Sequence, residues 1–157
     1  MSPFDTTAPD IAGVRPGTGT GAAVELRGNI FEMTQAAESA VLRPNEPGAF
    51  PHDLRAALAA RIARLSGDEA LAERHLAGAG ERAAIADPSS REEGLASILV
   101  FVDRVANTTR DITEDDVTAL RSAGVADADI VRLCELIAFI AYQIRVVAGL
   151  RLMGAGA

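Results

Sequence analysis

Apolar residues recur at helical spacing in the middle of the chain. In residues 51–66 the apolar positions follow steps of three and four, which place them on one face of a helix. They are Leu54, Leu58, Ile62 and Leu65. Pro51 suits a first helical turn and Gly67 suits a helix end, so we predict a helix over 51–66. Its three arginines, Arg55, Arg61 and Arg64, are expected on the other faces.

A second helix is predicted over residues 68–77. Asp68 and Glu69 stand at its start, where negative charge is favourable at the positive pole of the helix. Leu71 and His75 follow one turn apart. The rest of the chain is expected to pack around these two helices and the short break between them.

The remaining pattern predicts four further helices. Residues 22–42 form a helix that Gly28 weakens, and the turn-rich segment 43–51 follows it. Ser90 with Glu93 reads as a capping box before an apolar stripe that ends at the break 107–110. Thr113 with Asp116 begins a helix over 114–123. Asp127 caps a last helix over 128–152, which is apolar on nearly every side.

This pattern predicts an all-α fold, a bundle of about six helices. Residues 1–21 are rich in Pro, Gly and Thr and read as a flexible N-terminal arm, and residues 22–157 read as one helical domain. The arm holds a G-T-G-T-G run. No strand precedes the run and no Gly-Lys-Ser/Thr follows it, so we interpret it as a linker, or as an arm that orders on a partner subunit, and not as a phosphate loop.

Charge and cysteine content narrow the function classes. The formal net charge is −7 and all fifteen basic residues are arginines, which argues against nucleic-acid or anionic-membrane partners. The longest uncharged apolar run, residues 136–144, is far shorter than the ~20 residues of a membrane span. No targeting segment is visible, and one cysteine gives no disulfide framework, so we expect a cytoplasmic protein.

The run L-S-G-D-E-A-L-A-E-R-H, residues 65–75, resembles the AhpD-like (alkylhydroperoxidase D) and carboxymuconolactone decarboxylase families. Their peroxidase branch carries L-N-G-C-x-x-C-x-x-x-H here. His75 matches the histidine, whereas Asp68 and Leu71 stand at the two cysteine positions and Ala56 at the position of an upstream glutamate. Residues 98–150 also resemble the closing half of this peroxidase-related branch. The resemblance implies an all-helical homo-oligomer, a dimer, trimer or hexamer, and no cofactor.

Three functional hypotheses follow. The first is a degenerate family protein that has lost its peroxidase chemistry and acts as a binding or partner subunit, because an aspartate and a leucine cannot form a thiolate pair. The second is a decarboxylase-like enzyme in which His75 is the acid or base on a small carboxylate or lactone. The third is a residual peroxidase through Cys134, which we expect instead to be an inert buried residue.

Other candidate residues are weaker, and each has a structural interpretation. Arg145 is expected to be buried, in an ion pair or holding a substrate carboxylate. Glu73 is a possible ligand contact or part of a solvated face. His52 is interpreted as a turn residue, or as a metal ligand in a cluster with Asp68 and His75, although we assign no metal.

Overall fold

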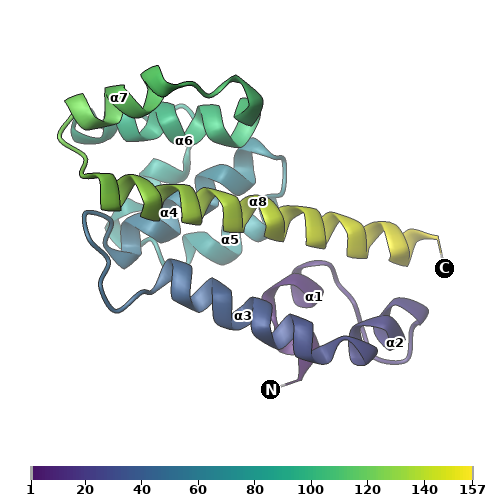
Figure 1. Cartoon of the computed structure of the whole chain (residues 1–157). Coiled ribbons are helices and arrows are strands. Elements are labelled where there is room, and N and C mark those ends of the chain that lie inside the picture. The colour runs from purple at the N-terminus through teal and green to yellow at the C-terminus, as the bar shows by residue number, and fades with distance from the viewer. Residues whose placement is uncertain (1, 157) are drawn as a thin grey trace. The chain divides into compact units, whose positions relative to one another are not determined.

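The computed structural model describes residues 2–156 (Figure 1), and every regular element in that range is helical. The prediction of an all-α protein is confirmed. The elements are η1 (Pro3–Asp5), α1 (Thr7–Ile11), α2 (Gly19–Leu26), α3 (Gly28–Leu42), α4 (His52–Leu65), α5 (Glu69–Leu76), η2 (Gly80–Ala86), η3 (Glu93–Leu95), α6 (Ala96–Thr108), η4 (Thr109–Asp111), α7 (Glu114–Ser122) and α8 (Asp127–Ala155), where η denotes a 3₁₀ helix. The described residues form two compact units: one runs up to Ala40 and resumes at Tyr142, and the other is Val41–Ala141. We call them the first and second unit.

Helix α4 is the centre of the second unit. It contacts α5, η2 and α6, and every residue from Leu54 to Ala63 is buried. Five of these ten residues are alanines, whose small side chains let neighbouring segments approach closely. Pro51 is the N-cap residue of α4 and not part of its first turn.

The three arginines of α4 were expected on faces other than the apolar stripe, and two of them are buried. Arg61 is fully buried and Arg55 is 2% exposed. Arg55 donates through Nε to Phe50 O (2.8 Å) and through Nη2 to Pro47 O (2.9 Å). Burial, followed by the charge of Arg132, lowers the pKa of Arg55 from its ordinary value.

The predicted starts of α6 and α7 had different outcomes. At α7, Thr113 and Asp116 form the expected capping box. The predicted box of Ser90 with Glu93 is wrong, because Ser90 N donates to Asp87 O (2.9 Å) and the 3₁₀ helix η3 precedes α6. The intervening turn starts α6 later than the sequence pattern suggests.

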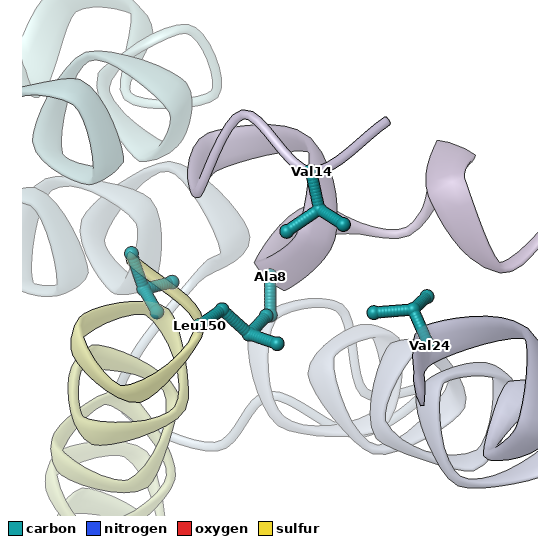
Figure 2. Close-up of a cluster of buried hydrophobic side chains, with 5 residues drawn as sticks. Ala8, Val14, Val24 and Leu150 are labelled. Carbon is teal, nitrogen blue, oxygen red and sulfur yellow. The ribbon is translucent and has the colours of Figure 1, made fainter. Parts of the chain in front are cut away.

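The first unit contains helices where the sequence pattern suggests an arm. Residues 3–11 form η1 and α1, and the predicted helix 22–42 is divided at Arg27 into α2 and α3. A cluster of buried apolar side chains joins α1, α2 and the end of α8; its members are Ala8, Val14, Val24, Val147 and Leu150. Figure 2 shows Ala8, Val14, Val24 and Leu150 converging.

Helix α8 is 29 residues long. Among the described residues it is the one helix long and apolar enough to cross a membrane, with a mean hydropathy of 1.7 over an 18-residue window of which 39% is buried. Core helices of water-soluble proteins have the same length and composition. The absence of a membrane partner therefore stays a prediction.

Candidate functional site

Helix α5 and its N-cap hold the three residues that the predicted resemblance aligns with the family motif. The N-cap residue is Asp68, whose Oδ1 accepts a hydrogen bond from the backbone N–H of Leu71 (3.1 Å). A carboxylate at this position satisfies a backbone donor that the helix cannot pair internally. The Asp68 side chain therefore has a structural role where the family has its first cysteine.

The two other motif positions face the interior of the second unit. Leu71 is fully buried and His75 is 4% exposed. Ala72, between them, is also fully buried. A general acid or base must reach a substrate, directly or through one water molecule. The burial of His75 favours a packing role over an exposed catalytic one.

The position of the family glutamate is closed by close packing. Ala56 lies on α4 and is 7% exposed. Gly78 follows α5, and a Cβ atom placed on it would lie 3.2 Å from the Ala56 Cβ. Glycine and alanine together let the end of α5 approach α4, and they leave little room there for a longer side chain.

The exposed acids of α5 pair with the one solvent-accessible arginine of α4. Arg64 donates to Glu69 (3.0 Å) and to Glu73 (2.8 Å). The hydrogen bond to Glu69 is the main reason that the pKa of Arg64 is raised. Glu73 thus lies on the surface in an ion pair whose expected contribution to stability is small.

The structure does not bring His52 into a metal site. His52 is exposed, and its Nε2 lies 2.9 Å from Pro44 O in the preceding turn. Within residues 2–156, no group of three or more His, Cys, Asp or Glu side chains is arranged to hold a metal ion. His52 is the first residue of α4 and contacts the turn that precedes the helix.

Two residues expected inside the protein are exposed. Arg145 belongs to the first unit and lies on the exposed side of α8, so its predicted burial is wrong. Cys134 is also exposed. Partial desolvation and the charge of Glu135 raise the pKa of the Cys134 thiol, which lowers its thiolate fraction at neutral pH. The apolar character of the whole helix hid the fact that one of its sides faces solvent.

Arg61, like Arg55, is a buried arginine of the second unit whose burial the sequence interpretation missed. Its Nε and Nη2 form a two-pronged ion pair with Asp103 (2.6 and 2.7 Å). Nη1 donates to Ile85 O and Asp87 O, and Nη2 also donates to Pro88 O (3.0, 2.6 and 2.8 Å). All five N–H donors of the guanidinium are therefore used, which joins α4 to α6, to η2 and to the loop after η2.

The first unit contains a second buried polar group. Glu38 is 3% exposed and Gln143 is fully buried. Glu38 accepts hydrogen bonds from the side-chain amide of Gln143 and from the hydroxyl of Thr7 (3.1 Å). Gln35 Oε1 accepts from the Thr7 backbone N–H (2.8 Å). The group fastens α1 to α3 and α8, and its members are too far apart in the sequence for spacing to reveal it.

Neither group resembles a catalytic centre, because each is filled by its own hydrogen bonds. No buried side-chain nitrogen or oxygen within residues 2–156 lacks a hydrogen-bond partner.

Comparison of the chain with protein-family models, with curated proteins and with solved structures gives no match.

Proposed function

We propose that this chain is a helical protein of the AhpD-like and carboxymuconolactone decarboxylase type that lacks redox chemistry and acts by associating with copies of itself. The observation that carries the proposal is the packing of α5. Leu71 is fully buried and Asp68 caps the helix, at the positions where the family has cysteines. A peroxidase cycle needs a thiolate, and neither side chain supplies one.

The decarboxylase-like alternative has less support. It needs His75 to reach a small carboxylate or lactone, and that side chain is 4% exposed. Arg145, the other candidate for holding a carboxylate, is an exposed residue of the other unit. No observation on either residue favours this reading over packing.

The exposed side of α8 supports association. Val131, Tyr142 and Met153 are 58%, 43% and 52% exposed. They are separated by eleven residues, about three helical turns, so they share one face of the helix. Glu135 and Arg145 are exposed on the same helix. Charged side chains are costly in hydrocarbon, so this mixed face suits a protein surface better than a lipid bilayer. We propose that this face of α8 contacts a second copy of the chain.

A peroxide assay tests the loss of redox chemistry. Purified full-length protein with an excess of a thiol reductant is expected to consume organic hydroperoxide no faster than the reductant alone. The reason is that Cys134, the one cysteine in the chain, has a raised thiol pKa and no second cysteine to form a disulfide with.

The matched control is Cys134→Ser, which should behave like the unmodified chain. Thiol-dependent peroxide consumption that disappears in Cys134→Ser would contradict the proposal. It would support the residual peroxidase hypothesis instead.

A further inference from the structure

The first unit has a pocket of about 440 Å³ that the proposed function does not use. The loop from Ala12 to Arg15, the start of α2 and the end of α8 line it. Its polar lining consists of two arginines and two threonines, Arg15, Thr18, Thr20 and Arg151. Its volume is in the range of small-molecule sites.

Positive charge dominates this lining. Arg15 is highly exposed and lies 3.9 Å from Asp10, a long and solvated ion pair. Arg151 donates to Ile11 O at 3.3 Å. Arg15 Nη1 also donates to Val14 O (3.4 Å), and its guanidinium has further N–H donors for an oxyanion, while Arg151 adds a second positive charge to the lining. Arg151 also offsets the negative pole at the nearby end of α8.

The start of α2 adds backbone donors. Thr18 is the N-cap residue: its hydroxyl donates to Arg15 O (2.9 Å) and accepts from Gly21 N (2.9 Å). The backbone N–H groups of Gly19 and Thr20 have no acceptor among the described residues. Such first-turn N–H groups, at the positive pole of a helix, favour anions.

Gly21 makes this geometry possible. A Cβ atom at position 21 would lie 2.2 Å from the carbonyl oxygen of Arg15. Only glycine lets the loop carrying Arg15 fold this closely onto α2. The glycines of the G-T-G-T-G run therefore have a local structural purpose, although the run is not a phosphate loop of the strand and lysine type.

Thr20 gives an independent indication of a ligand. Its side chain lines the pocket, and the residue is 6% exposed. None of the described residues forms a hydrogen bond with its hydroxyl. The hydroxyl would be 4.0 Å from a Cβ atom on Gly154, across the pocket. Because every fully buried side-chain oxygen of the described residues has a partner, this unbonded hydroxyl is open to the pocket, where it can bond a ligand.

We propose that this pocket binds the phosphate group of a small molecule. Arg15 and Arg151 balance its charge, and the hydroxyl and backbone N–H of Thr20 bind its oxygens. Donors reach the pocket from a loop, a helix start and a helix end. A tetrahedral phosphate can accept from all of these, whereas a carboxylate offers two oxygens in one plane. The volume leaves room for the rest of a phosphorylated molecule.

Titration of the full chain with inorganic phosphate, followed by ¹H–¹⁵N NMR, tests the proposal. Saturable shifts are expected at the amides of Gly19 and Thr20. Arg15→Gln and Arg151→Gln should each weaken binding roughly tenfold, because each removes charge-assisted hydrogen bonds. Thr20→Val keeps the shape and the net charge of the protein and should weaken binding by a smaller factor.

The control variant is Arg110→Gln, whose side chain is 92% exposed in the second unit, and it should bind phosphate like the unmodified chain. Three results would overturn the proposal: no saturable shift at Gly19 and Thr20, unchanged affinity in both arginine variants, or acetate binding as tightly as phosphate at equal ionic strength. If an arginine variant fails to fold, the phosphate affinity of Thr20→Val and the amide shifts in the unmodified chain still test the proposal.

Discussion

Replacing Arg61 with methionine is expected to lower the free energy of unfolding by about 3–5 kcal/mol, the cost of breaking a buried ion pair from one side. The guanidinium is fully buried and uses all five donors. Its removal leaves Ile85 O and the Asp103 carboxylate without their donor, whereas Asp87 O keeps Ser90 N and Pro88 O keeps Arg91 Nη1. The measurement is urea denaturation followed by far-ultraviolet circular dichroism, since the chain has no tryptophan.

Arg64→Met is the matched control for this prediction. Arg64 lies on the same helix, but its partners Glu69 and Glu73 are exposed. Surface ion pairs contribute about 0–1 kcal/mol, so the control should unfold close to the unmodified chain. Equal midpoints for the Arg61 and Arg64 variants would show that the buried network does not hold α4 in place.

The second large effect is expected for Leu71→Ala, which should cost about 2–5 kcal/mol. Leu71 is fully buried, at the position where the proposed family has its second cysteine. Truncation leaves a cavity that close-packed neighbours cannot fill completely. The same denaturation experiment measures the loss.

Leu26→Ala is the control for this position, because Leu26 is 80% exposed and its truncation should change stability by less than about 0.5 kcal/mol. A Leu71→Ala variant as stable as the unmodified chain would mean that position 71 borders open space. That result would indicate that α5 borders a ligand site.

Local signals in the sequence predicted much of the fold. The starts of α7 and α8 and the ends of α4 were predictable within a residue or two, because capping residues and helix stops act within one turn. The division of the predicted helix 22–42 at Arg27 was harder to predict. Gly28 lies directly after the break, but a glycine weakens a helix without specifying that it ends there.

Burial of polar residues was the part that sequence could not supply. Helical periodicity places Arg61 one turn from Leu58 and one turn from Leu65, beside the apolar stripe of α4, but its charge suggested exposure to solvent. Its partners come from η2, from the loop after it and from α6, 24 to 42 residues away, and only tertiary packing brings them to it. The converse holds for Cys134, where an apolar neighbourhood suggested burial and α8 exposes that side.

The environment of the candidate residues could not be predicted from the sequence. The motif identified Asp68, Leu71 and His75 as corresponding positions, and spacing placed them on one short helix. Such a helix can line a pocket or pack against a core. Which of the two occurs depends on neighbours such as Gly78 and Ala56, and no sequence motif predicts their contact.

The solution mass of the full chain tests the central claim of association most directly. Size-exclusion chromatography with light scattering at micromolar concentration should give a multiple of the 16.3 kDa chain mass. The double variant Val131→Glu with Met153→Glu should shift the mass toward the single chain, and Leu26→Glu should not. A mass of one chain for the unmodified protein would contradict the account.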